Sequence, residues 1–250
     1  MGDPFLQLIV FIYNTVGLQN LGFAIVEIAV LSRVVFYPFA KQQIHYSKKM
    51  SELTPHINAL KDKHKGNQQA FAAAQMALFK ENGVNPAAGC LPAIVQIVIL
   101  FGLLGAMNTI LTMNLNTGFL IWDMAKPDAF KVSGIPFALP GILVTLAALT
   151  QFIQTKMMMP AAAPKIRTDD KPAEKKEKAG FMSEFAEAQS SMIWMFPLMF
   201  LFLGTQWPSG LALYWTVSSV LAIAQQYKIS GFGGLEQYVV KLKQWQPKKL

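Results

Sequence analysis

Arg33 is the residue of this chain whose type and position are best suited to chemistry. It lies in the apolar segment 21–40, eight residues before Lys41, so about 12 Å of helix separates it from the charged end of that segment. An arginine at the centre of a membrane helix costs roughly 2.5–3.5 kcal/mol on insertion scales. Two hypotheses follow: the guanidinium extends to the lipid headgroups, or it faces a water-filled cavity and attracts a transient negative group.

Polar residues in the other apolar segments favour the cavity, because buried polar groups in lipid are costly unless they are paired or hydrated. These residues are Gln96, Gln151, Gln154, Thr216, Ser218, Ser219, Gln225 and Gln226. Glu27 is the only other charged residue in segment 21–40. Six residues at about 100° each put Glu27 and Arg33 about 120° apart on a helix, so they do not share a face. The sequence therefore predicts an uncompensated positive charge at Arg33.

The sequence contains no recognisable catalytic centre, and we expect neither enzyme activity nor a cofactor. The three histidines, His45, His56 and His64, lie in one polar segment without a cysteine or carboxylate cluster, so we expect no metal site. Ser-His-Asp and His-Glu-x-x-His arrangements at membrane depth are absent, and so is a Gly-rich phosphate loop.

The composition indicates a membrane protein. Apolar residues make up 53% of the 250 residues and charged residues 14%, against about 25% charged in ordinary soluble domains. Segments 82–122, 132–155 and 188–227 contain no charged residue, and a membrane span needs roughly 20 apolar residues. The last segment is too long for one helix and is interrupted by GTQWPSG at 204–210, so it predicts two spans joined by a turn.

We therefore expect an all-α polytopic membrane protein with five transmembrane helices, an N-terminal interfacial amphipathic helix and a cytoplasmic helical hairpin. The expected segments are an extra-cytoplasmic interfacial helix (1–18), a first span (19–40), the hairpin (41–86), a second span (87–112), an outer loop (113–131), a third span (132–157), a flexible cytoplasmic loop (158–187), a fourth span (188–206), a fifth span (207–229) and a basic cytoplasmic tail (230–250). Pro4 is expected at the first position of the interfacial helix. Gly66 and Asn67 are expected in the turn of the hairpin.

The distribution of positive charge predicts the orientation. Nineteen lysines and arginines fall in segments 41–86, 156–187 and 228–250, whereas only Lys126 and Lys131 fall on the other side. Because cytoplasmic loops carry the excess of lysine and arginine, the N-terminus is expected outside and the C-terminus in the cytoplasm.

Short motifs lie in a fixed order along nearly the whole chain. They are SRVVFYP at 32–38, LTP at 53–55, NPAAGCLPAIVQ at 85–96, FIQTKM at 152–157, FPLMF at 196–200, WPSGLALYW at 207–215 and QQY at 225–227. In this order and spacing they are similar to those of the YidC/Oxa/Alb family of membrane protein insertases, in a bacterial form without the large extra-cytoplasmic domain of Gram-negative members.

The resemblance implies a hydrophilic groove within the five-span core, open to the cytoplasm and to lipid, through which nascent membrane proteins are inserted and helped to fold. The residues that match its substrate-binding groove are Arg33, Gln96, Gln154, Trp215 and Ser218. Tyr37 and Pro38 match the inner end of the first span. The hairpin 41–86 matches cytoplasmic helices implicated in substrate recruitment.

The resemblance also implies partners and a location. The expected partners are nascent membrane proteins, the ribosome, membrane lipids and, in addition, the Sec translocon and the signal recognition particle receptor; DNA is not expected. Candidates for ribosome or lipid contact are Lys241, Lys243, Lys248 and Lys249. The expected location is the bacterial plasma membrane, with the thylakoid membrane as the alternative. The alternative function is a small-solute (anion) transporter or channel that selects anions at Arg33, although five spans give no inverted repeat.

Overall fold

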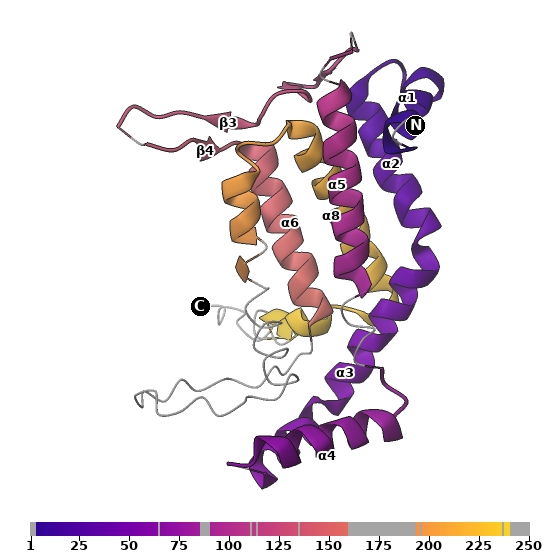
Figure 1. The fold of residues 1–250 in the computed structure, drawn as a ribbon, viewed down its shortest axis with the longest axis vertical. Helices are drawn as coiled ribbons and strands as arrows, with labels where there is room; N and C mark the ends of the chain where they lie inside the picture. The colour runs from indigo at the N-terminus through magenta and orange to yellow at the C-terminus, as the bar shows by residue number, and fades with distance from the viewer. Residues whose placement is uncertain are drawn as a thin grey trace, which may run out of the picture. The chain divides into compact units, whose positions relative to one another are not determined.

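The computed structural model describes residues 4–64, 66–85, 91–110, 112–113, 115–134, 136–159, 194–195, 197–236 and 238–240. It is mostly helical (Figure 1), with α1 Pro4–Thr15, α2 Leu21–Val35, α3 Tyr37–Lys63, α4 Gln68–Glu81, α5 Leu91–Ile110, α6 Ile142–Met158 and α8 Ser209–Ser230. Residues 197–203 are also helical, and Gly233–Leu235 form a short 3-10 helix. Pro4, the expected first residue of α1, is helical and is also the first described residue, so the helix start itself stays a prediction.

Four short strands lie in the connection between α5 and α6. Strand β1 (Gly118–Phe119) pairs antiparallel with β2 (Trp122–Asp123), and β3 (Ala129–Phe130) pairs antiparallel with β4 (Leu139–Pro140). The chain divides into two compact units. The first contains Met1–Ala40, Cys90–Thr155 and Trp194–Gln225, and the second contains Lys41–Gly89, Lys156–Ile193 and Gln226–Leu250.

The expected first span, 19–40, is interrupted at Phe36. Pro38 has no N–H with which to continue the ladder of α2. The N–H of Phe36 still donates to the carbonyl of Ser32 (2.9 Å), four residues earlier, but Pro38 cannot donate to Val34 in the same way, and a new helix begins at Tyr37. Among the described residues, no single helix is both long enough and apolar enough to cross a membrane. The helices Leu21–Val35 and Tyr37–Lys63, which are bent by 64° relative to each other, meet both requirements when they are taken as one pair.

The structure also differs from the expected third span, 132–157, at its start. Residues 129–130 and 139–140 form the β3–β4 hairpin, and α6 begins only at Ile142. Gly134 adopts φ +91°, which a helix does not accommodate, and Pro140 lacks the N–H that a helix would require. A segment without charged residues, such as 132–155, can form either an apolar hairpin or a helix, so its composition alone does not predict which of the two forms.

Helix α8 lies at the centre of the first unit. Five consecutive residues, Leu211 to Trp215, are buried, so this part of the helix has no solvent face. They belong to a hydrophobic cluster that also contains Ile25, Met107 and Val144 from α2, α5 and α6. The ends of the Met107 and Ile25 side chains occupy the position that a Cβ atom at Gly210 would take, so the glycine lets the start of α8 approach α5 and α2 closely.

The connection between α5 and α6 binds the first residues of two other helices. The N–H of Leu21, at the start of α2, donates to the carbonyl of Asn116 (2.9 Å). At the start of α8, the N–H of Ser209 donates to the carbonyl of Lys126 (2.8 Å), and its hydroxyl donates to the carbonyl of Asp123 (2.7 Å). The loop therefore holds the starts of α2 and α8 at one end of the bundle.

Asp128 extends the same arrangement to α6. Its Oδ2 accepts hydrogen bonds from the N–H groups of Leu143 (2.6 Å) and Val144 (3.2 Å) in the first turn of α6. Its Oδ1 accepts from the indole N–H of Trp122 in β2 (3.1 Å). A carboxylate at a helix N-terminus satisfies backbone donors that have no partner within the helix. A single side chain thus joins the β1–β2 ribbon to α6.

The second unit contains the predicted helical hairpin. The turn includes Gly66 at φ +86°, and the side chain of Asn67 caps α4 by accepting from the N–H of Ala70 (3.0 Å). Leu53 of α3 packs with Phe79 of α4 and with Val84 beyond it. The structure therefore confirms two helices packed through their apolar faces.

Several expectations concern parts of the chain that lie outside the described residues. These parts are residues 160–187 of the flexible loop, residues 188–193 of the fourth span, and Lys241, Lys243, Lys248 and Lys249 of the tail.

Candidate functional site

Arg33 lies in the last turn of α2 and contacts α8. Its Nε–H donates to the hydroxyl oxygen of Ser218 at 3.2 Å. Ser218 is buried, with 7% of its surface exposed, whereas Arg33 is half-buried. Among the described residues, no carboxylate forms an ion pair with Arg33. A guanidinium has five N–H donors, so four of them remain for water or for an anionic group.

A second polar contact joins the same two helices. The hydroxyl oxygens of Ser32 and Tyr214 lie 3.5 Å apart, and Ser32 also donates to the carbonyl of Ala29 (2.9 Å). Tyr214 was not predicted from the sequence. Its position four residues before Ser218 was the available signal, because residues four apart lie on one face of a helix. The pairs Arg33–Ser218 and Ser32–Tyr214 together hold α2 against α8 through polar groups.

Helix α8 makes a further polar contact with α6. The hydroxyl of Ser219 donates to Oε1 of Gln151 at 3.2 Å, and Ser219 is buried. Ser218 and Ser219 are adjacent and point to different neighbours, one to α2 and the other to α6. Polar groups from three helices are therefore gathered around this part of α8.

The other residues expected in the groove are not joined to Arg33. Gln96 of α5 and Gln154 of α6 are half-buried, and no hydrogen bond between described residues links either side chain to Arg33 or Ser218. Trp215 is only 4% exposed and packs on Phe200, with ring centroids 4.8 Å apart. Of the predicted set, the structure brings Arg33 and Ser218 into contact and places Trp215 in the hydrophobic cluster.

Tyr37 and Pro38, expected at the inner end of the first span, are the first two residues of α3. Both are exposed. Glu27 lies on α2, and its buried atom Oε2 has no hydrogen-bond partner among the described residues. No group of three or more His, Cys, Asp or Glu within the described part of the chain is placed to bind a metal ion.

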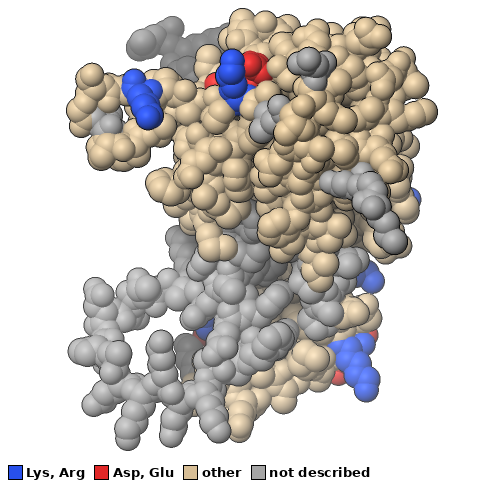
Figure 2. All heavy atoms as spheres, turned by 45° about the horizontal axis from the view of Figure 1, so that its top comes forward, with Lys and Arg blue, Asp and Glu red and all other residues tan. Residues whose placement is uncertain are grey.

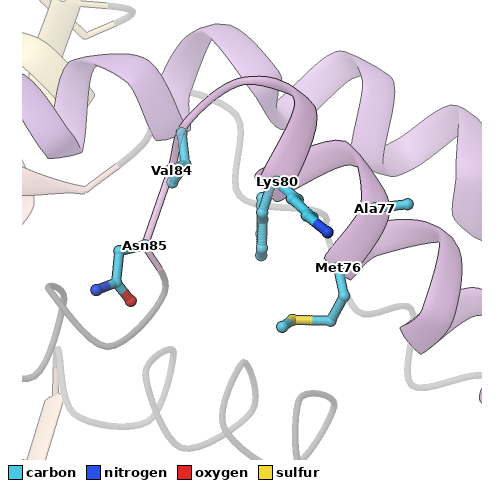
Figure 3. Close-up of a pocket in the computed structure, with 6 residues that line it drawn as sticks. Met76, Ala77, Lys80, Val84 and Asn85 are labelled. Atoms are coloured by element: carbon cyan, nitrogen blue, oxygen red, sulfur yellow. The ribbon is translucent and has the colours of Figure 1, made fainter.

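The second unit contains a pocket of about 410 Å³ at the C-terminal end of α4 (Figure 3). The residues that line it are Met76, Ala77, Phe79, Lys80, Val84 and Asn85. Phe79 is buried, whereas Met76 is 45% exposed. A flexible, polarizable methionine at the opening allows the pocket to adapt to apolar groups of different shape, and Lys80 adds a positive charge.

Replacing Ser218 with alanine is expected to change the environment of the Arg33 Nε–H, because its hydrogen-bond acceptor is removed. Arg33 and Arg167 are the only arginines, so ¹⁵N-arginine labelling gives two Nε signals, and Arg167→Lys assigns them. We expect Ser218→Ala to shift the Arg33 signal in solid-state NMR spectra. Ser219→Ala, which removes the hydroxyl that binds Gln151, is the control and should leave that signal in place. Equal shifts in the two variants would contradict the contact.

Comparisons with known proteins agree with the resemblance seen in the sequence. Residues 11–233 match the model of the family described as 60Kd inner membrane protein. The membrane protein insertase YidC of Geobacter sulfurreducens is 31% identical over 232 residues, which are 92% of this chain and 37% of the relative. The membrane protein insertase YidC 2 of Bacillus anthracis is 33% identical over 232 residues, 91% of this chain and 78% of the relative. The chain likewise spans only 36% of the insertase of Citrifermentans bemidjiense.

Proposed function

We propose that this chain, which belongs to the 60Kd inner membrane protein family, is an insertase for nascent membrane proteins. Membership of the family makes it a membrane protein. The name of its relatives, membrane protein insertase, supports the activity, and the site at Arg33 supplies a chemical means for it. The test is insertion of a single-span client into vesicles that contain only the purified chain, compared with empty vesicles.

The observation that carries the proposal is the half-buried guanidinium of Arg33, held by Ser218 and without a carboxylate partner among the described residues. An apolar bundle gains nothing in stability from such a charge unless it is hydrated or binds an anion. A client helix that carries a short acidic tail supplies the anion transiently. In the proposal, Arg33 binds the tail carboxylate while the apolar part of the client remains beside α6 and α8.

Completion of insertion requires no nucleotide in this proposal. Burial of apolar surface in lipid contributes about 25 cal/mol per Å², so the client moves downhill once its tail has entered the polar region. The groove is hydrophilic, open to the cytoplasm and to lipid, and formed by five spans. The hydrogen bonds that join the α5–α6 connection to the starts of α2, α6 and α8 support closure of the groove at that end.

The pocket of α4 is proposed to recruit clients before insertion. Its apolar lining suits the hydrophobic part of a nascent span, and Lys80 at its edge suits an acidic flank. A photo-crosslinker at Ala77, which lines the pocket, is expected to form adducts with a ribosome-stalled client. A crosslinker at Gln69, also exposed on α4 but outside the pocket lining, is the matched control. Equal yields at the two positions would contradict a role for the pocket.

Further partners and the topology belong to the same proposal. The N-terminus lies outside and the C-terminus in the cytoplasm of a bacterial plasma membrane, and Lys241, Lys243, Lys248 and Lys249 contact the ribosome or lipid headgroups. The Sec translocon and the signal recognition particle receptor are proposed as additional partners. The alternative, an anion transporter or channel, predicts solute flux into vesicles that contain this chain alone.

A further inference from the structure

The β3–β4 hairpin is an exposed apolar element attached to the start of α6. Figure 1 shows the two strands extending sideways from the end of α6, across the direction of the helix. Its large apolar side chains have few neighbours, since Phe130 is 52% exposed, Val132 42% and Phe137 57%. Packing within the chain therefore does not explain why these positions are apolar. A surface of this kind marks an interaction site.

The hairpin combines exposed apolar side chains with a single charge. Phe130 pairs directly with Leu139, and paired residues project from the same face of a ribbon. Lys131 directly follows Phe130 and the end of β3. Lys131 is the only charged residue between positions 129 and 140, and Figure 2 shows a basic side chain on the projecting arm, whose other described surface is uncharged. A ribbon with exposed phenylalanines and a single lysine suits the boundary between acyl chains and anionic headgroups.

The apolar surface of the hairpin continues onto α6. Ile142, the first residue of the helix, is 61% exposed, and Leu149, two turns later, is 52% exposed. In a membrane protein, a helix face with such residues contacts lipid. The hairpin leaves the helix where this face begins, so both surfaces can contact the same bilayer.

The β1–β2 ribbon at the same end of the bundle gives an independent indication. Leu120 and Ile121 form its two-residue turn and are 83% and 79% exposed. Leu120 adopts φ +54°, a left-handed conformation that is unfavourable for a residue with a Cβ and that glycine adopts more readily. A turn selected only for stability would carry glycine or asparagine there. Exposed leucine and isoleucine in this turn indicate contact with an apolar medium.

We propose that the β3–β4 hairpin is a membrane-surface anchor, with Phe130 and Phe137 inserted into the acyl-chain boundary at the membrane face where α6 begins and with Lys131 beside anionic headgroups. The occupant of this apolar surface is the bilayer that holds the chain. Such an anchor fixes the height and tilt of α6, whose Gln151 contacts α8 through Ser219. The proposal requires a membrane location and does not depend on insertase activity.

The depth of single spin labels tests the anchor. In a Cys90→Ala background the chain has no other cysteine, so Phe130→Cys, Phe137→Cys and Lys126→Cys each carry one label. Lys126 lies at the same end of the bundle outside the hairpin, and 77% of its side chain is exposed. The full chain is reconstituted in phosphatidylethanolamine–phosphatidylglycerol vesicles, and collisions with O₂ and with a water-soluble nickel chelate are compared.

We expect the ratio of O₂ to nickel collisions to be several-fold higher at positions 130 and 137 than at 126. Adding Phe130→Asp to the chain labelled at 137 should lower that ratio toward the value at 126, because a charge is expelled from the boundary. Equal ratios at 126, 130 and 137 would overturn the proposal. Dipolar broadening at 137 that disappears on dilution with unlabelled chain would also overturn it, since a second copy would then occupy the surface.

Discussion

Arg33→Ala is expected to reduce insertion of a client with an acidic tail about tenfold, whereas Arg33→Lys should retain most of the activity. Two unit charges 4 Å apart attract each other by about 1 kcal/mol in bulk water and about 4 kcal/mol near a protein surface, and about 1.4 kcal/mol corresponds to a tenfold change in rate. Lysine keeps the charge but loses the Nε–H that donates to Ser218. The measurement is protection of the inserted client from external protease in vesicles that contain only the purified variant.

The matched control for Arg33→Ala is a change in the client. A client whose tail carboxylates are replaced by amides should insert at nearly the same rate with the unmodified chain as with Arg33→Ala, because the attraction to the tail has been removed. An equal loss with the acidic and the amide client would mean that Arg33 supports the fold of the bundle. Equal activity of Arg33→Ala and the unmodified chain on the acidic client would refute the role of the charge.

The sequence predicted those parts of the molecule that follow from local patterns. The hairpin turn at Gly66 and Asn67 depends on residues whose local preferences are strong, since Gly66 adopts φ +86° and Asn67 caps α4. The family resemblance and the polar character of both residues predicted that Arg33 and Ser218 line the same groove, but not that they contact each other. The hydrogen bond itself depends on how α2 packs against α8, which no local pattern encodes.

Other features could not be predicted because charge-free segments leave the backbone conformation open. Residues 132–141 are uncharged and precede the helix, since Gly134 and Pro140 disfavour a helix there. The family resemblance implied that Trp215 contacts the substrate, but its side chain is buried against Phe200. Asp128 had no expected role, because its three partners, Trp122, Leu143 and Val144, are brought to it only by the folded loop.

Asp128→Ala is expected to lower the free energy of unfolding by about 2–4 kcal/mol. The change removes the acceptor of two N–H groups at the start of α6 and of the Trp122 indole. Loss of an N-cap costs about 0.5–2 kcal/mol, and hydrogen bonds to charged groups contribute about 1.5–3 kcal/mol each when measured singly. Chemical unfolding of the purified chain in detergent, followed by tryptophan fluorescence, measures the loss.

Asp123→Ala is the matched control, because it removes a carboxylate from the same loop. Hydrogen bonds from the Thr117 hydroxyl and from Lys126 hold the pKa of Asp123 below its usual range. Its partners Ala125 (N–H to Oδ1, 3.1 Å) and Lys126 (3.0 Å) lie within the same turn, and the Lys126 side chain is exposed, so the ion pair contributes about 0–1 kcal/mol. Asp123→Ala leaves the start of α6 capped and should therefore destabilise the chain less than Asp128→Ala.

Gly141→Ala should displace the Asp128 carboxylate without changing Asp128 itself. A Cβ atom at position 141 would overlap the carboxylate, so the side chain of Asp128 must leave the start of α6. Because both variants break the same hydrogen bonds, their effects on the free energy of unfolding should not add in the double variant. Full additivity, or an Asp128→Ala effect no larger than that of Asp123→Ala, would show that the three hydrogen bonds do not hold this end of the bundle together.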